Sequence, residues 1–165
     1  MPFSVAWPGL RDAYLDWFSA YEATGGAFES AETALRAAPE GLNLFGRLDR
    51  VDRQPDGAPM LIDYKTERAE RSKDRVAAGN EDTQLPFCAL LSGAAAPRAA
   101  YLNLAERETP KLYELKNLPE LAGQLLAGMR EDMARIAAGA PLPALGEGSV
   151  CDWCDARGLC RKDAW

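Results

Sequence analysis

The chain has 165 residues, with 19 Lys or Arg, 25 Asp or Glu and no histidine, so its formal net charge is -6. This length fits one domain, and the negative charge argues against a protein that grips nucleic acid over its whole surface; a local basic groove stays compatible with it. No apolar run approaches the roughly 20 residues needed to cross a bilayer, and no signal peptide is visible at the start. We therefore expect a cytoplasmic chain with no membrane partner.

The first half of the chain predicts one helix followed by three strands. A helix is expected over about 9–23, ended by Gly25 and Gly26, because apolar side chains recur there at helical spacing: Leu10, Tyr14, Trp17, Phe18 and Tyr21. Extended stretches near 28–37, 42–53 and 59–66 are separated by turn residues, which predicts a three-strand meander.

The second half predicts two helices and two short strands. A helix near 81–93 precedes strands near 99–104 and 111–115, which gives a sheet of about five strands. A last helix begins at Asn117 and ends at Gly139, and one face carries Leu118, Leu121, Leu125, Met129, Met133 and Ile136. That face predicts packing against the core. We expect a main domain over 1–140 and a cysteine-containing tail of the same domain over 141–165.

Candidate chemistry gathers on the second and third strands. Asp63 and Lys65 are two apart and share one face, while Tyr64 points away. If Pro55, Asp56 and Gly57 form the loop, Gln54 pairs with Ala58 and Asp49 lies opposite Asp63, with Cβ atoms about 4.5–5.5 Å apart. Opposed carboxylates repel each other unless a divalent cation binds between them. The alternative is that both aspartates are solvated at strand ends or paired with arginines, namely Arg47, Arg50 or Arg53.

Apolar residues occur on both faces of these strands. Alternation places Leu42, Leu44 and Leu48 on one side of the second strand, with Phe45 and Val51 on the other, and it places Leu61 opposite to Ile62. Strands that are apolar on both faces belong in the middle of a sheet covered by helices on both sides.

Two motifs carry a family resemblance. Gly46-Arg47-Leu48-Asp49-Arg50-Val51-Asp52, followed by Ile62-Asp63-Tyr64-Lys65-Thr66, resembles the PD-(D/E)xK nuclease superfamily, most closely its RecB and AddB branch. Gln84-Leu85-Pro86-Phe87-Cys88 is similar to the helical motif of that branch, with cysteine in place of its tyrosine. The tail residues Cys151, Cys154 and Cys160 resemble the C-terminal cysteines with which AddB-type and related CRISPR-associated nucleases hold a 4Fe-4S cluster.

The resemblance implies a restriction-endonuclease-like α/β core, with a mixed central sheet flanked by helices. It implies that Asp49, Asp63 and the backbone carbonyl of Tyr64 bind Mg or Mn, and that Lys65 orients or deprotonates the attacking water. Gln84 would contact DNA or a metal-bound water; a lone helical glutamine is otherwise a surface residue. The implied function is DNA exonuclease activity within a recombination and double-strand-break repair machine, with a helicase–nuclease subunit as partner.

The chain departs from the family upstream of Gly46. It has no histidine and no cysteine before Cys88, which suggests a fragment of a larger helicase–nuclease subunit that lacks an upstream metal ligand and the first cluster cysteine. Glu29 or Glu32 could fill the place of a family glutamate, and Glu32 is preferred; the alternative is a pair of exposed edge-strand residues.

The cysteines and the basic residues after Lys65 leave further alternatives. Cys151, Cys154 and Cys160 supply three thiolates where an iron–sulfur cluster or structural zinc takes four. Cys88 is better explained as a buried free thiol, so the cluster is expected in the full-length parent and absent or incomplete here. A polar loop carries Arg68, Arg71, Lys73 and Arg75 and either lines a sequence-independent DNA channel or is only solvated. Two functions compete with the nuclease: an inactive nuclease-fold scaffold, and a small zinc or iron–sulfur interaction module.

Overall fold

The computed structural model describes residues 2–77, 82–105 and 109–141 and, in the tail, residues 151, 154–156 and 159–160. The chain divides into two compact units, Met1–Gly128 and Met129–Trp165. The candidate site lies wholly in the first unit. None of the helices in the described ranges is long and apolar enough to cross a membrane.

Four α-helices and five strands make up the described part of the chain. They follow in the order α1 (Pro2–Ala23), β1 (Ala27–Ala37), the 3-10 turn η1 (Pro39–Gly41), β2 (Leu44–Arg53), β3 (Pro59–Lys65), α2 (Ala69–Arg75), α3 (Gln84–Ser92), β4 (Arg98–Asn103), β5 (Lys111–Glu114) and α4 (Leu118–Ala137). The predicted meander, the helix before β4 and the last two strands are confirmed.

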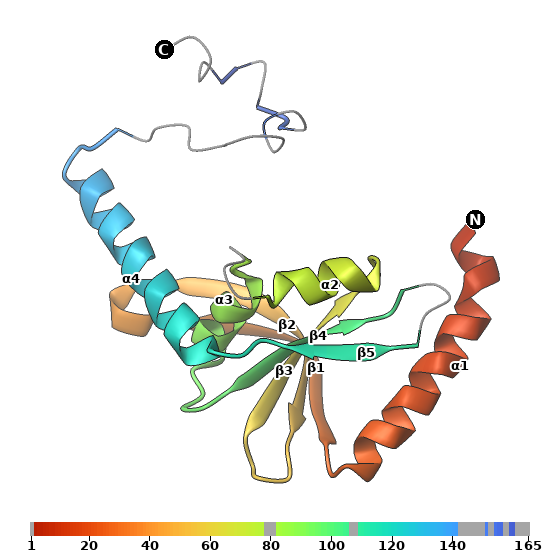
Figure 1. Ribbon diagram of the computed structural model, residues 1–165. Coiled ribbons are helices and arrows are strands. Elements are labelled where there is room, and N and C mark those ends of the chain that lie inside the picture. The colour runs from red at the N-terminus through yellow and green to blue at the C-terminus, as the bar shows by residue number, and fades with distance from the viewer. Residues whose placement is uncertain are drawn as a thin grey trace. The chain divides into compact units, whose positions relative to one another are not determined.

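One mixed sheet has the strand order β1-β2-β3-β4-β5. β1, β2 and β3 are antiparallel neighbours, β3 and β4 are parallel, and β5 returns antiparallel to β4. The parallel pair needs a crossover, which α2 and α3 provide (Figure 1). The crossover brings α3 back over the carboxyl end of β3. This α/β architecture is the predicted restriction-endonuclease-like core, and the fold prediction is confirmed.

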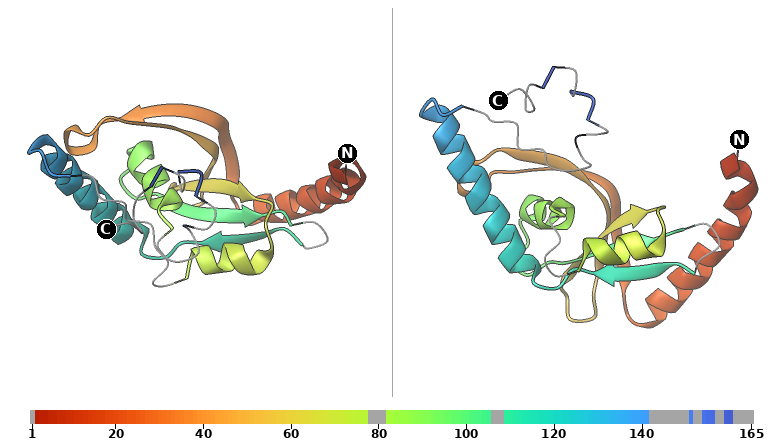
Figure 2. Two further views of the ribbon diagram at one scale, coloured as in Figure 1. Left: turned by 90° about the horizontal axis from the view of Figure 1, so that it is seen from above. Right: turned by 45° about the horizontal axis from the view of Figure 1, so that its top comes forward.

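The central strand β3 is covered on both faces, as alternation of its side chains requires. Leu61 packs into a core with α3 residues such as Leu85 and Leu91, and Ile62 packs on the other face against Tyr14 and other aromatic side chains of α1. In Figure 2 the β1–β2 hairpin curves over α3. That close approach needs a glycine, because a Cβ at Gly46 would lie 2.9 Å from the Leu91 side chain.

The predicted side-chain alternation along β2 is wrong at Val51, and the predicted helix cover of its second face is wrong at Phe45. Leu44, Leu48 and Val51 all pack into the α3-side core, although the odd spacing between Leu48 and Val51 predicts opposite faces. Phe45 is 75% exposed and has no helix over it. β2 is continuous from Leu44 to Arg53, but between Leu48 and Val51 its pairing with β1 skips Asp49 and its pairing with β3 ends at Arg50, and the alternation changes face there.

Two helical expectations are also corrected. Within α4 only Leu118 and Ala122 are buried, while Met133 and Ile136 are 54% and 39% exposed, so the apolar face packs on the core only at its start. Periodicity predicts that a helix forms, but it does not predict how much of the apolar face of the helix is buried. The segment predicted as a polar loop after Lys65 instead contains α2, with Glu70 in its first turn and Lys73 and Arg75 in its last, an order that favours a helix.

Candidate active site

The site forms where β2 and β3 separate. Gln54 N–H donates to the Ala58 carbonyl at 2.9 Å, so the loop is the predicted one. The ladder then runs from Arg53 opposite Pro59 to Arg50 opposite Ile62 and ends there. The next pair in this register is Asp49 and Asp63, as predicted, but at that position the strands no longer pair through their backbones.

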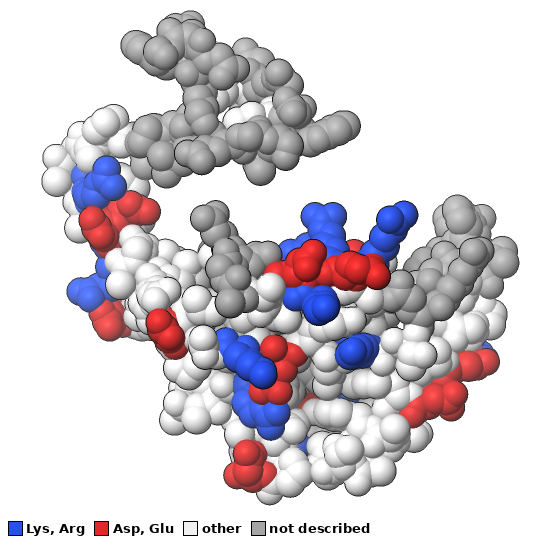
Figure 3. Space-filling view, in the orientation of Figure 1, with Lys and Arg blue, Asp and Glu red and all other residues white. Residues whose placement is uncertain are grey.

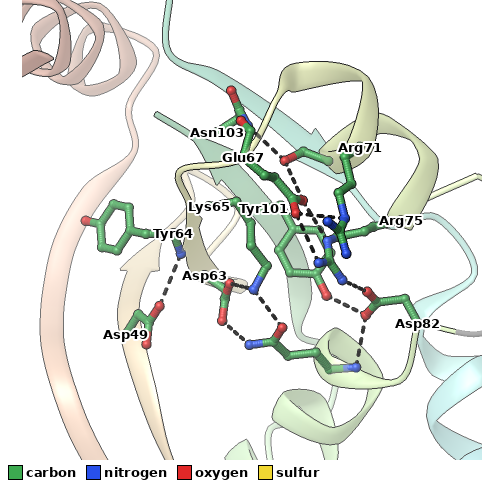
Figure 4. Close-up of polar contacts among 12 residues, drawn as sticks. Asp49, Asp63, Tyr64, Lys65, Glu67, Arg71, Arg75, Asp82, Tyr101 and Asn103 are labelled. Atoms are coloured by element: carbon green, nitrogen blue, oxygen red, sulfur yellow. Dashed lines mark hydrogen bonds and ion pairs between the residues drawn. The ribbon is translucent and has the colours of Figure 1, made fainter. Parts of the chain in front are cut away.

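Asp49 is released from the backbone pairing on its other side as well. The β1–β2 ladder pairs Ala31 with Arg50 and Thr33 with Leu48 and passes over Glu32, whose φ is +50°. Asp49 instead binds β3 through its side chain, because Oδ2 accepts a hydrogen bond from the Tyr64 N–H at 3.1 Å (Figure 4). The carboxylate is therefore fixed against the strand that carries Asp63.

Asp63, Lys65 and Gln84 form a closed triangle of polar contacts. The Lys65 Nζ lies 2.6 Å from Asp63 Oδ2 and donates to Gln84 Oε1 at 2.7 Å. Gln84 Nε2 donates to Asp63 Oδ1 and completes the triangle. Asp63 and Lys65 therefore share a face, and the parallel crossover supplies Gln84 at the first position of α3. Tyr64 points to the other face, where its hydroxyl lies 3.3 Å from that of Tyr14.

Asp63 is a buried carboxylate whose negative charge is only partly offset by neighbouring groups. Burial raises its pKa from the ordinary value, Lys65 opposes that rise, and the charges of Asp49 and Asp82 add to it. Its Oδ2 atom is shielded from water and accepts no well-directed hydrogen bond, so its only close partner is the Lys65 ammonium. A buried acceptor of this kind is open to a further cation.

A small cavity of ≈ 10 Å³ is lined by Asp49, Asp63, Arg50 and apolar residues that include Leu85 and Cys88. This is room for about one water-sized particle. Oxygen ligands at such a cavity suit Mg or Mn, which keep water and substrate oxygens in the remaining positions. Within the described ranges no group of three or more His, Cys, Asp or Glu side chains is arranged to hold a metal. Asp49 and Asp63 are therefore two candidate carboxylate ligands without a third ligand of these types beside them in the described part of the chain.

The three arginines of β2 do not neutralise Asp49. Arg47 pairs with Glu32 at 3.3 Å, Arg53 pairs with Glu29 at 2.9 Å, and Arg50 pairs with its own strand neighbour Asp52. The same contacts occupy Glu29 and Glu32, both on exposed positions of β1. Neither glutamate has a described contact with Asp49 or Asp63.

Sequence reasoning missed a group of polar residues behind the triangle. Asp82 accepts hydrogen bonds from the Tyr101 hydroxyl at 2.6 Å and from the Gln84 N–H at 3.1 Å, and it pairs with Arg75 at 2.5 Å. Arg75 also binds Glu67, at 2.7 Å. The signal for Asp82 was its place two residues before Gln84, where a carboxylate caps a helix; nothing in the sequence indicates Tyr101.

The basic residues of α2 are divided between paired and exposed positions. Arg71 and Arg75 both pair with Glu67, and Arg68 and Lys73 are exposed. Figure 3 shows acidic and basic side chains interspersed over the region of α2. This segment presents a mixed-charge surface, and Arg68, Arg71 and Lys73 are exposed cations within it.

The cysteines lie in two different settings. Cys88 is half-buried on α3, and burial, followed by the charges of Asp63 and Asp49, raises the pKa of its thiol to about 11. Cys151 is half-buried, Cys154 and Cys160 are exposed, and none of the four forms a disulfide. The three tail cysteines belong to the second unit, and their predicted role in an iron–sulfur cluster stays a prediction.

The comparison with protein families agrees with this geometry. A family model for the PD-(D/E)XK nuclease superfamily matches residues 4–161. The chain belongs to this superfamily. Membership covers both the α/β sheet and the hairpin that carries Asp49 and Asp63, and it indicates a nuclease. No curated protein sequence matches the chain significantly.

Proposed function

We propose that this PD-(D/E)XK domain is a metal-dependent DNA exonuclease in which Asp49 and Asp63, with the Tyr64 carbonyl, hold Mg or Mn. The observation that carries the proposal is the pair of carboxylates at the β2–β3 fork, beside a cavity the size of one water, with Lys65 and Gln84 bound to Asp63. Such a like-charged pair destabilises a fold unless a cation binds it.

The bound cation would acidify a water and stabilise negative charge on the scissile phosphate. The remaining roles in the proposed reaction belong to side chains of the protein. The Lys65 ammonium, held at 2.6 Å from Asp63, orients the attacking water and offsets charge that develops on the phosphate. Gln84 accepts from Lys65 and donates to Asp63, so its amide orientation is fixed and both side chains stay in place. The Tyr64 N–H holds Asp49.

We further propose a place for the domain in a RecB- or AddB-type cytoplasmic machine for recombination and double-strand-break repair, as part of a helicase–nuclease subunit. The support is the similarity of the Gly46–Asp52 and Ile62–Thr66 motifs and of the three tail cysteines to that branch. In such a parent, Cys151, Cys154 and Cys160 would bind three irons of a 4Fe-4S cluster whose fourth cysteine comes from elsewhere. DNA would be bound without base-specific contacts, with Arg68 and Lys73 as surface cations near the site.

A second candidate function is an inactive nuclease-fold scaffold that binds DNA. The observation in its favour is that Asp49 and Asp63 stand without a third acidic or histidine ligand in the described part of the chain. The interaction-module alternative is disfavoured because the superfamily match extends over the hairpin and the sheet and not only over the cysteines.

Calorimetric titration of Mn²⁺ into the purified chain tests the proposal. The wild type is compared with the double variant Asp49→Asn/Asp63→Asn, and end-labelled linear DNA is digested in parallel. We expect binding and cutting by the wild type and neither by the variant. Binding without cutting favours the scaffold, and binding that survives both substitutions contradicts the metal site.

A further inference from the structure

Lys65 lies on β3 and Gln84 lies on α3. The carboxylate of Asp82 contacts the Gln84 backbone and the tyrosine whose ring faces Lys65. Asp82 Oδ1 accepts a hydrogen bond from the Tyr101 hydroxyl at 2.6 Å and one from the Gln84 N–H at 3.1 Å. The first contact fixes the ring of Tyr101, and the second caps the first turn of α3 at Gln84. Figure 4 shows Asp82 and Tyr101 on the side of Lys65 remote from Asp49.

The ring of Tyr101 faces the Lys65 ammonium. β4 runs parallel to β3 with Tyr101 beside Asp63, which puts the ring on the face of the candidate site. Lys65 Nζ lies 4.8 Å from the ring centroid, and Tyr101 is 1% exposed. A cation over an aromatic face is attracted to it, and more strongly when water is excluded. The ammonium thus has three neighbours: a carboxylate, an amide oxygen and this ring.

Asp82 is itself held in place from the α2 side. Although burial acts to raise the pKa of Asp82, hydrogen bonds from Tyr101, Arg75 and the Gln84 backbone hold it below its usual range. Arg75 binds Asp82 and, through two further hydrogen bonds at 2.7 and 3.1 Å, Glu67. Glu67 also accepts from Ser72 at 3.1 Å. Asp82 is therefore tied to α2 through Arg75 and to α3 through the Gln84 N–H.

We infer that Tyr101 and Asp82 are positioning residues: the Tyr101 ring holds the Lys65 ammonium at the reaction centre, and Asp82 fixes that ring together with the helix end that carries Gln84. The inference rests on the proposed nuclease function. Lysine carries a point charge on a flexible four-carbon stem, so the salt bridge to Asp63 alone does not fix the direction of the Lys65 ammonium. Support from fixed neighbours supplies the orientation that catalysis needs.

The test compares Tyr101→Leu, which removes the ring, with Tyr101→Phe, which keeps the ring and loses the hydroxyl. Tyr113→Leu is a matched control, because Tyr113 lies directly opposite Tyr101 on β5 and its ring faces a different lysine, Lys111, at 5.4 Å. Circular dichroism and thermal melts verify folding, and Tyr101→Met replaces the leucine variant if that variant is unfolded.

Two readouts are needed. In ¹³C-lysine NMR spectra, methylene protons near Nζ that lie over an aromatic face are shifted by its ring current; the Lys65→Arg variant assigns the signal. Steady-state cleavage of linear DNA with Mn²⁺ gives kcat and KM, and calorimetry gives the Mn²⁺ affinity.

We expect Tyr101→Leu to lose the Lys65 ring-current shift and about 10²-fold in kcat, with KM and Mn²⁺ affinity unchanged, as a misplaced catalytic group implies. Tyr101→Phe keeps the ring but loses the hydrogen bond to Asp82, so it should retain only part of the shift and recover only part of the rate; a variant equal to the wild type would overturn the role of Asp82 in fixing the ring. Tyr113→Leu should move only the Lys111 signal. An unshifted Lys65 in the wild type overturns the inference, as does a lost shift with kcat unchanged or a rise in KM alone. A wild type that binds no metal and cuts no DNA refutes the proposed function, and the Lys65 shift still decides the role of Tyr101.

Discussion

Residues 49–52 of β2 contribute to two buried charge clusters on opposite faces of the sheet. On the α1 face, Arg50 and Asp52 form an ion pair at 2.7 Å, with side chains 2% and 0% exposed. Arg50 also donates to the Tyr14 hydroxyl at 2.7 Å and lies 4.8 Å from the ring centroid of Phe18. On the α3 face, Asp49 and Asp63 have the same charge, and Lys65 is the cation that contacts Asp63.

The two clusters differ in their balance of charge. The Arg50–Asp52 pair is electrically neutral, and aromatic rings surround the guanidinium, although Arg50 Nη2 and Asp52 Oδ2 are buried without a hydrogen-bond partner. The Asp49–Asp63–Lys65 cluster keeps an excess of negative charge, and the pKa of Asp63 is raised by burial first, with the charge of Asp49 adding to the rise. A buried cluster with unbalanced charge is a candidate for function, and a balanced one is a candidate for stability.

The largest expected effect is loss of cutting when the unbalanced cluster is broken. Asp63→Ala and Lys65→Ala should each lower kcat by about 10³-fold, because each removes a group that stabilises charge at the reaction centre. Digestion of end-labelled DNA with Mn²⁺ measures this loss. Lys116→Ala, which removes an exposed lysine of the same unit, is the control and should cut normally. Normal cutting by both site variants would contradict the assignment.

Breaking the balanced cluster should instead destabilise the fold. Asp52→Ala leaves the Arg50 guanidinium buried without its carboxylate, and we expect a loss of about 3–5 kcal/mol in the free energy of unfolding. Urea denaturation followed by circular dichroism measures it. Arg50→Met/Asp52→Leu removes both charges and should recover most of that loss. If the double variant is as unstable as Asp52→Ala, packing and not charge explains the effect.

A smaller effect is expected from the pH dependence of stability without metal. Because the pKa of Asp63 is raised in the folded chain, its stabilising contribution is complete below the ordinary value of 3.8 and is lost as pH rises through the folded value. Asp63→Asn does not titrate, so it should be more stable than the wild type in EDTA at pH 7. The advantage should vanish near pH 4, which thermal melts between these pH values would measure. Mn²⁺ should reverse the order at pH 7 by stabilising only the wild type.

Local sequence rules predicted the hairpin because its geometry is decided within a few residues. The turn at Pro55–Gly57 sets the register, and the register sets Asp49 opposite Asp63. The same rules failed for Leu48 and Val51, which lie on one side of the sheet although their spacing is odd. The pairing of β2 with β1 skips Asp49 between them, and a period of two cannot anticipate such an interruption.

The contacts of Tyr101, Asp82 and Arg75 around the site could not be predicted from the sequence either, because they depend on elements that are distant along the chain. Tyr101 follows Lys65 by 36 residues and meets it only because β4 returns parallel to β3. Arg75 looked like one cation among several in a polar loop, and its pairing with Glu67 and Asp82 appears only when α2 and α3 are placed. Gln84 was located through a family resemblance, since a lone helical glutamine predicts nothing.

The smallest effect concerns a third charged pair, which tests whether burial is what distinguishes the two clusters. Arg98 binds Glu114 through two contacts of 2.8 and 2.7 Å across β4 and β5, and its guanidinium lowers the pKa of Glu114. Both side chains are about two-fifths exposed, so solvent screens the pair, and Glu114→Gln should cost less than about 1 kcal/mol. Urea denaturation in low and high salt measures the cost, which should shrink as salt rises. If Glu114→Gln lowers the free energy of unfolding as much as Asp52→Ala does, then good geometry, and not exclusion of water, determines how much an ion pair stabilises this fold. The contrast between the two faces of β2 would then have no physical basis.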